Sequence, residues 1–233
     1  MKHIKQIIFD ADDTLWENNI FYLKAANDFF DLLEMEGIKR SYAAHAFDKL
    51  ELQVVEDLGY GSINFIFILE ELYRKFQISG KHNEEKFNHI VEEFNSHKLG
   101  KPNLFENVPE IMEQLSHKYR LYILTKGNYQ EQELKILKSD LTIFLHNYFI
   151  LDEKNDPAYA NLLKTNNWNA EETCMIGNSP KSDINPALRN NMYAVHIPYS
   201  NTWKVDIEPI IKTNGKYKQI SSFIELTDLF LSK

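Results

Sequence analysis

Cysteine and basic residues are scarce in this chain. Cys174 is the only cysteine among 233 residues, so an internal disulfide bond and a cluster of thiolate metal ligands are both excluded. Lysines and arginines number 26 against 34 aspartates and glutamates, which gives a formal net charge of −8. Because proteins bind nucleic-acid backbones through Lys and Arg, this balance argues against a broad nucleic-acid surface. A local basic site for one small phosphate remains compatible with it.

Long apolar runs are also missing. The richest run, residues 63–69, contains Asn64 and is much too short to span a membrane. The N-terminus runs almost at once into a predicted strand, which leaves no room for a signal peptide. The histidines are scattered, without the spacings typical of zinc sites. We therefore expect no membrane association and a cytoplasmic enzyme.

The most informative segment that is present covers residues 7–15. An apolar run typical of a buried strand is followed by Asp10-Ala11-Asp12-Asp13-Thr14. Side chains alternate along an extended chain, so Asp10 and Asp12 project the same way if the chain stays extended. Two close carboxylates repel each other unless a cation or a shared proton lies between them. They could serve as nucleophile and acid or base beside Mg²⁺, or they could form a solvated acidic turn.

A second apolar strand pattern, residues 121–124, ends at Thr125. It is followed by Lys126, Gly127 and Asn128, with a helix predicted to begin near Tyr129. A hydroxyl, the backbone amides of a glycine turn and the positive end of a helix can together cradle phosphate oxygens. Taken alone, Thr125 could equally be an ordinary residue at the end of a strand.

Two further strand patterns also end in polar residues. Lys154 follows residues 148–151, where a cation could neutralise a phosphate and keep a nucleophilic carboxylate ionised. Asn178 and Asp183 follow residues 173–176 and are oxygen donors suited to a metal shell. The order of these residues at successive strand ends favours one shared site, because the carboxyl ends of parallel strands meet at one edge of a sheet.

These residues as a set resemble the motifs of the haloacid dehalogenase superfamily. Its phosphatases carry an Asp-x-Asp-x-Thr first motif, a Ser or Thr second motif, a Lys third motif and an acidic fourth motif. Residues 10–14 look like the first motif, Thr125 the second, Lys154 the third and residues 177–183 the fourth. The resemblance extends from residue 7 to about residue 197.

The resemblance implies a reaction with two carboxylates. Asp10 would attack phosphorus to form an aspartyl-phosphate, while Asp12 would protonate the leaving oxygen and later take a proton from water. Thr125 and Lys154 would bind the phosphoryl group. Dehalogenases of the superfamily lack an acid at the position of Asp12, because halide leaves without a proton, so Asp12 favours a phosphatase.

The same resemblance implies Mg²⁺ as cofactor. Its ligands would be the carboxylate of Asp10, the backbone carbonyl of Asp12, Asn178 and Asp183. One departure is visible, because the family usually has an acid directly after the glycine of the fourth motif and this chain has Asn178. An amide oxygen can bind Mg²⁺ but brings no negative charge, so we expect weaker metal affinity or a larger share for Asp183.

Residues beside the catalytic turn are candidates for substrate binding. Trp16 and Glu17 directly follow that turn, where the family has a mobile flap. Lys126, Gly127 and Asn128 follow the second motif and are predicted to contact the substrate as well. Lys126 could instead remain solvated.

The chain alternates strands and helices after about residue 106, which predicts an α/β fold with a doubly wound parallel sheet. Residues 17–105 read as helices, with Ser41, Ser62 and Asn83 as candidate N-caps. This block resembles the superfamily's small helical cap, although it could simply enlarge the core. We predict a catalytic core of residues 1–16 and 106–233 with an inserted cap of residues 17–105.

Three functional hypotheses follow. The leading one is a Mg²⁺-dependent phosphatase acting on a small phosphorylated metabolite, as a monomer or homodimer without nucleic-acid partners. A dehalogenase is the second. The third is a catalytically weak phosphate-binding module, which only Asn178 makes worth considering. A mutase is a variant of the first, since an aspartyl-phosphate can pass to a second hydroxyl instead of water.

Overall fold

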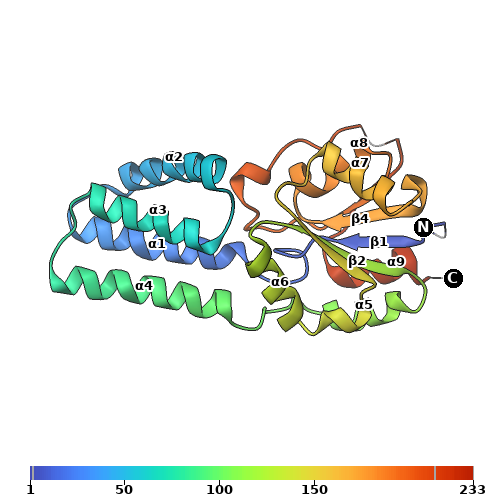
Figure 1. Cartoon of the computed structure of the whole chain (residues 1–233), viewed down its shortest axis with the longest axis horizontal. Helices are drawn as coiled ribbons and strands as arrows, with labels where there is room; N and C mark the ends of the chain where they lie inside the picture. Colours follow the sequence, from blue (N-terminus) through green and yellow to red (C-terminus); the bar gives the residue numbers. More distant parts are fainter. Residues whose placement is uncertain (2, 213, 233) are drawn as a thin grey trace. The chain divides into compact units, whose positions relative to one another are not determined.

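A computed structural model describes residues 1, 3–212 and 214–232 of the chain. The chain folds into two compact units, one of Met1–Asn19 with Pro102–Lys233 and one of Ile20–Lys101 (Figure 1). The second unit is inserted after the first strand of the first unit, so the core is built from two separate stretches of chain. The predicted boundaries between the catalytic core (residues 1–16 and 106–233) and the cap (residues 17–105) stay a prediction.

The first unit contains a six-stranded parallel sheet in the order β3-β2-β1-β4-β5-β6. The central strand β1 pairs on both sides, so that Phe9 lies level with Ile123 and Ile176. This arrangement confirms the predicted α/β class. The strands are β1 (Gln6–Phe9), β2 (Arg120–Lys126), β3 (Asn147–Leu151), β4 (Thr173–Gly177), β5 (Tyr193–His196) and β6 (Tyr217–Gln219).

Helices cover both faces of this sheet, as expected for a doubly wound fold (Figure 1). Side chains alternate along β1, so Ile7 and Phe9 enter one apolar cluster while Ile8 enters the other. One face packs against α5 (Val108–Ser116), α6 (Tyr129–Lys138) and α9 (Leu226–Phe230), and the other against α7 (Asp156–Thr165) and α8 (Asn185–Arg189).

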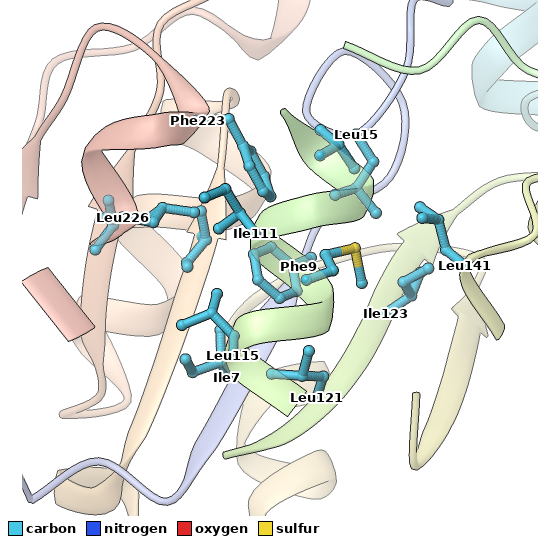
Figure 2. Packing of buried hydrophobic residues seen from close by; sticks show 14 of the residues in the cluster. Ile7, Phe9, Leu15, Ile111, Leu115, Leu121, Ile123, Leu141, Phe223 and Leu226 are labelled. Atoms are coloured by element: carbon cyan, nitrogen blue, oxygen red, sulfur yellow. The ribbon is translucent and has the colours of Figure 1, made fainter. Parts of the chain in front are cut away.

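The larger cluster lies between α5 and the sheet. Figure 2 shows Ile111 and Leu115 of α5 beside Phe9, with Phe223 and Leu226 from the end of the chain packed next to them. Every residue of β1 is buried. Burying one such aliphatic or aromatic side chain contributes roughly 1.5–3 kcal/mol. The strand that leads to Asp10 is therefore held firmly from both faces.

Several short helices and one short strand complete the first unit. The last helical segment begins as η5 (Phe223–Glu225) and continues as α9, with Ser222 and Glu225 forming a capping box. The sixth strand was not predicted, because β6 is only three residues long and partly exposed. The other short elements are η1 (Leu141–Phe144), η2 (Ala170–Glu172), the π-helix η3 (Pro180–Ile184) and η4 (Lys204–Asp206).

The second unit consists of helices, which confirms the helical insertion. Its apolar core is rich in aromatic rings, including edge-to-face pairs of Phe29 with Phe87 and Phe30 with Phe47. The aromatic residues of this unit therefore pack with one another and form its core. The helices are α1 (Asn19–Met35), α2 (Arg40–Leu58), α3 (Ser62–Lys75) and α4 (Lys81–Leu99).

The predicted N-caps of these helices are wrong by one to three residues. The observed cap positions are Lys39, Gly61 and Gly80, and none of them makes a side-chain capping hydrogen bond. Gly61 and Gly80 have positive φ angles of 145° and 97°, so backbone freedom of glycine rather than a polar side chain sets the start of α3 and α4. Across the described residues, no helix is both long enough and apolar enough to cross a membrane.

Candidate active site at the carboxyl edge of the sheet

The predicted site residues follow the carboxyl ends of adjacent strands. Asp10 follows β1, Thr125 lies near the end of β2, Lys154 comes three residues after β3, and Asn178 directly follows β4. Because β1 pairs with β2 and β4, and β2 pairs with β3, these ends share one edge of the sheet. The structure thus brings side chains that are up to 168 positions apart in sequence, from Asp10 to Asn178, to the same edge.

Lys154 lies between two carboxylates at the centre of the site. Its Nζ donates to Oδ1 of Asp10 and to Oδ1 of Asp183, at 2.5 Å in each case, and lies 3.3 Å from the carbonyl oxygen of Leu124. The three charged residues are 3%, 5% and 0% exposed for Lys154, Asp10 and Asp183. Two buried carboxylates therefore share one ammonium group, and one negative charge lacks a partner within this triad.

Burial is the main cause of the raised pKa values of the two carboxyl groups. Burial, with a further contribution from Asp183, raises the pKa of Asp10 to about 7, although Lys154 and Thr14 oppose the shift. Burial also raises the pKa of Asp183 against the opposing effect of Lys154. Burial alone would lower the pKa of Lys154, but the two carboxylates outweigh it and raise that pKa above its usual value. A divalent cation at this point would compensate the charge that the protein leaves unbalanced.

Thr14 connects the first motif to the fourth. Its hydroxyl donates to Oδ2 of Asp10 at 2.7 Å and accepts from the backbone N–H of Asn178 at 3.1 Å. The amide oxygen of Asn178 lies 3.3 Å from the same hydroxyl, and its Nδ2 donates to Oγ1 of Thr202 at 3.0 Å. The ring Nε2 of His196 lies 3.1 Å from the backbone oxygen of Asn178. These contacts hold Asn178 beside Asp10.

Asp183 is held by hydrogen bonds and close contacts with the segment that follows β4. Oδ2 of Asp183 accepts from the backbone N–H of Ser179 at 2.9 Å, and the Ser179 hydroxyl accepts from the N–H of Ser182 at 2.9 Å. The carboxylate of Asp183 also lies directly against Gly177, where a Cβ atom would come within 2.3 Å of Oδ2. The glycine at the end of β4 is therefore required by the close approach of this side chain.

Asp12 has a separate set of partners. Its Oδ1 accepts from Nε1 of Trp16 at 2.6 Å, and its Oδ2 accepts from Nε2 of Gln132 at 2.9 Å. Nζ of Lys135 lies 2.6 Å from both oxygens. Gln132 and Lys135 both belong to α6. The two carboxylates of the first motif are thus bound to different lysines, Lys154 for Asp10 and Lys135 for Asp12.

Two residues predicted to bind substrate have other partners. Trp16 is fully buried in the apolar core, so it offers no surface to a substrate, and its indole N–H is used by Asp12. The prediction for Trp16 is corrected accordingly, because its large apolar ring gains more from burial than from exposure. Glu17 is partly exposed and accepts a hydrogen bond from Nδ2 of Asn103 at 2.6 Å.

The segment after Thr125 is also committed to internal contacts. The backbone N–H of Gly127 donates to the carbonyl of Leu151 at 3.0 Å, and the side chain of Asn128 caps α6 by accepting from the N–H of Glu131 at 3.1 Å. The N–H of Gly127 and the side chain of Asn128 therefore have internal partners, and the contact of this segment with substrate stays a prediction. Thr125 is buried.

Lys126 remains next to the fourth motif. Its Nζ donates to Oγ of Ser182 at 2.9 Å and to Oδ1 of Asp206 at 3.0 Å. Asp206 lies at the end of η4, a segment that sequence reasoning did not connect to the site. Lys126 therefore ties the end of β2 to both η3 and η4.

The oxygen donors near Asp10 fit Mg²⁺. Asp10, Asp183 and the amide oxygen of Asn178 are hard donors, and the backbone carbonyl of Asp12 is a fourth candidate. Within the described part of the chain, no group of three or more His, Cys, Asp or Glu side chains is arranged to hold a metal. A Mg²⁺ site here would therefore need the amide and the backbone carbonyl as well as the two carboxylates.

Sequence reasoning missed Gln132 and Lys135. Both are 7% exposed and lie three residues apart on α6, beside the buried Ile136. Polar residues at positions of the helical apolar stripe were the available signal, since such residues are seldom buried without a partner.

Comparison with known proteins agrees with this geometry. The family model of the haloacid dehalogenase-like hydrolases matches residues 4–190. The glyceraldehyde 3-phosphate phosphatase of Pyrococcus furiosus is 26% identical over 238 residues, which cover 98% of this chain and 91% of that protein.

Two solved structures show the same fold. A haloacid dehalogenase-like hydrolase of Xanthomonas campestris superposes with a TM-score of 0.80 at 24% identity, over 98% of this chain and 91% of its own. The hydrolase YfnB of Bacillus subtilis, bound to magnesium, superposes with a TM-score of 0.62 at 19% identity, over 98% and 99% of the two chains. Since the family model covers well over half of the sequence, this chain belongs to the haloacid dehalogenase-like hydrolases.

Proposed function

We propose that this protein is a Mg²⁺-dependent phosphatase that hydrolyses a small phosphomonoester through a covalent intermediate on Asp10. The observation that carries the proposal is the buried Asp10–Lys154–Asp183 triad, with Asp12 two residues away on its own set of hydrogen-bond donors. Phosphoryl transfer needs mainly positioned charge and a nucleophile, and this edge of the sheet supplies both.

In the first step an oxygen of Asp10 attacks phosphorus. The bond from phosphorus to Asp10 forms as the bond to the leaving oxygen breaks, and Asp12 gives its proton to that oxygen. Thr14 and Lys154 hold Asp10 by one hydrogen bond to each carboxylate oxygen, which fixes its orientation for attack. Lys154 also offers positive charge to the transferring group.

In the second step water attacks the aspartyl-phosphate. Asp12, now ionised, takes a proton from the water, the bond from phosphorus to the new oxygen forms, and the bond to Asp10 breaks. Inorganic phosphate leaves, and both carboxyl groups return to their initial states. A bound Mg²⁺ would lower the repulsion between Asp10 and the anionic substrate. Asp10, Asn178, Asp183 and the backbone oxygen of Asp12 are the residues that would hold it.

The substrate proposed is a small phosphorylated metabolite, with sugar phosphates as the leading class. The Pyrococcus furiosus relative, named for glyceraldehyde 3-phosphate, supports this class at 26% identity. We assign the helical unit Ile20–Lys101 the role of a cap that restricts access to small molecules. A dehalogenase remains the alternative enzyme, and Asp12 weighs against it, because halide departure needs no proton.

The test is hydrolysis of para-nitrophenyl phosphate, followed by a panel of metabolite phosphates, with Mg²⁺ and with chelator. We expect metal-dependent phosphate release that Asp10→Asn reduces at least about a thousandfold, because the amide is a poor nucleophile. Asp228→Asn, which makes the same change at an exposed position of α9, is the matched control and should retain wild-type activity.

Three results would overturn the proposal. Phosphate release that continues undiminished in Asp10→Asn would remove Asp10 from the chemistry. No release from any ester, together with metal-independent chloride release from a 2-haloacid, would establish the dehalogenase instead. Metal binding without turnover of any ester would point to the phosphate-binding module.

A further inference from the structure

Asp12 is surrounded by hydrogen-bond donors from Trp16, Gln132 and Lys135, and none of these residues belongs to the four motifs. Lys135 contacts both carboxylate oxygens at 2.6 Å, Trp16 contacts Oδ1 at 2.6 Å, and Gln132 contacts Oδ2 at 2.9 Å. Lys135 also lies 3.3 Å from Oδ1 of Asn18. Each oxygen of Asp12 therefore receives two hydrogen bonds, which fixes both the position of the carboxylate and its rotation.

The donors are rigidly placed. Gln132 and Lys135 are adjacent on one face of α6, at a spacing of three residues, and both are 7% exposed. Nε2 of Gln132 also lies 3.2 Å from the backbone oxygen of Lys126 at the end of β2. Oε1 of Gln132 is buried and has no hydrogen-bond partner. Leaving an acceptor unsatisfied is unfavourable, so the amide orientation is set by its contacts with Asp12 and Lys126.

Asp10 and Asp12 have different hydrogen-bond partners, so their carboxylates lie in different surroundings. Asp10 is held by Thr14 and Lys154, whereas Asp12 is held by residues of α6 and by Trp16. Pairs of acids with distinct environments are typical of sites in which one group is a nucleophile and the other exchanges a proton. Of the two lysines in the site, Lys135 on α6 is the one that contacts Asp12.

We propose that Lys135 and Gln132 are positioning residues for Asp12, which direct its proton to the leaving oxygen and stabilise the carboxylate that remains. The inference rests on the proposed function. In the first step the O–H bond of Asp12 breaks and the proton moves to the leaving oxygen. The resulting carboxylate is the form that four donated hydrogen bonds suit best. It persists until it takes a proton from water in the second step.

The test uses phenyl phosphates that differ in the acidity of the leaving phenol but hardly in size. para-Nitrophenolate leaves with little need of a proton, whereas phenolate needs one, so the ratio of their kcat/KM values reports proton donation. In Lys135→Met we expect kcat/KM for phenyl phosphate to fall roughly tenfold more than for para-nitrophenyl phosphate. Lys138→Met, an exposed lysine on the same helix, should leave the ratio unchanged.

A second variant guards against failure of the first to fold. Gln132→Met removes the donor but keeps side-chain length, and it should shift the ratio in the same direction by a smaller factor. In the Asp12→Asn background, adding Lys135→Met should change the ratio no further, because the group that it positions is gone. Thermal unfolding of each variant separates loss of fold from loss of positioning.

The outcomes distinguish failure of the proposed function from failure of the positioning role. An inactive wild-type protein on every ester would defeat the proposed function itself. An active wild type in which Lys135→Met and Gln132→Met lower both kcat/KM values by equal factors, or lower neither, would overturn the positioning role alone. A further change in the ratio on the Asp12→Asn background would overturn it as well.

Discussion

At the residue scale, Asp183 lies so close to Gly177 that no side chain fits at position 177. A Cβ atom on residue 177 would lie 2.3 Å, 2.5 Å and 2.7 Å from Oδ2, Cγ and Cβ of Asp183. Asp183 cannot simply rotate away, because its two oxygens bond to Lys154 and to the N–H of Ser179. The glycine therefore serves the position of a buried carboxylate rather than an unusual backbone angle.

Gly177→Ala tests this explanation. We expect a loss of about 1–3 kcal/mol in the free energy of unfolding, as for overpacking of a tight core, together with reduced phosphatase activity. Urea unfolding and turnover of para-nitrophenyl phosphate measure the two effects. Wild-type stability with full activity would mean that Asp183 tolerates displacement and that the close contact has no structural importance.

Asn178 is the second residue of interest, since it stands where the family usually has an acid. Its amide oxygen lies 3.3 Å from the Thr14 hydroxyl, and that hydroxyl bonds to Asp10. A carboxylate here would add a negative charge among the proposed metal ligands, and Mg²⁺ affinity rises with ligand charge. The change also removes the Nδ2 donor to Thr202, whose hydroxyl bonds to the carbonyl of Tyr199.

We expect Asn178→Asp to tighten Mg²⁺ binding by roughly tenfold, equivalent to about 1.4 kcal/mol. The Mg²⁺ concentration that gives half-maximal activity, and direct calorimetric titration of the metal, both measure it. Asn147→Asp adds the same charge at the exposed start of β3 and is the control. Equal or weaker metal binding by Asn178→Asp would show that this amide is not a ligand.

At the element scale, α6 links the second motif to Asp12. The helix begins at Tyr129, directly after Asn128, whose side chain caps it. It then places Gln132 and Lys135 on the side that faces Asp12. The Asn128 cap therefore contributes both to the stability of α6 and to the positions of Gln132 and Lys135.

Asn128→Ala should lower the free energy of unfolding by about 1 kcal/mol, the usual cost of losing an N-cap. Asn128→Asp retains an acceptor at the cap and should stay within a few tenths of a kcal/mol of wild type. Urea denaturation of the three proteins decides the matter. If the alanine and aspartate variants were equally unstable, the cap hydrogen bond would not be what Asn128 contributes to stability.

At the scale of the whole molecule, the buried charge imbalance at Asp10, Lys154 and Asp183 couples folding to protons and metal. The pKa of Asp10, raised by burial to about 7 without metal, lies above the usual value of 3.8. The stability associated with this raised pKa is therefore fully present below about pH 4 and is lost as the pH rises through about 7. Above pH 7 the ionised carboxylate is left for a cation to neutralise.

We therefore expect Mg²⁺ to raise the unfolding temperature more at pH 8 than at pH 6, because at pH 6 the metal must first displace a proton. At a hundredfold excess over its Kd, the metal would add about 2.7 kcal/mol at the favourable pH. Thermal unfolding with and without Mg²⁺ at both pH values measures the difference. In Asp10→Asn the pH dependence of this difference should disappear, and its persistence would point to another titrating group.

Much of the fold was predictable from the sequence. Apolar runs and helical periodicity depend on neighbouring residues, so the four strands that lead to the motif residues, the helical insertion and the parallel class of the sheet could be inferred from the sequence. The short strand β6 and the starts of α3 and α4 could not, because pairing with β5 and glycine backbone angles decide them. Local propensity is weak at such positions, and tertiary contacts override it.

The sequence alone also determined the order of the motif residues, because each lies at or shortly after the end of its own strand and all parallel strands end at one edge. Only the tertiary structure decided which partners those residues have. It paired Lys135 with Asp12 across 123 positions, buried Trp16, and used Gly127 and Asn128 for internal hydrogen bonds. The physical reason is that strand and helix formation depends on nearby residues, whereas the burial and charge pairing of a side chain depend on distant segments brought together by folding.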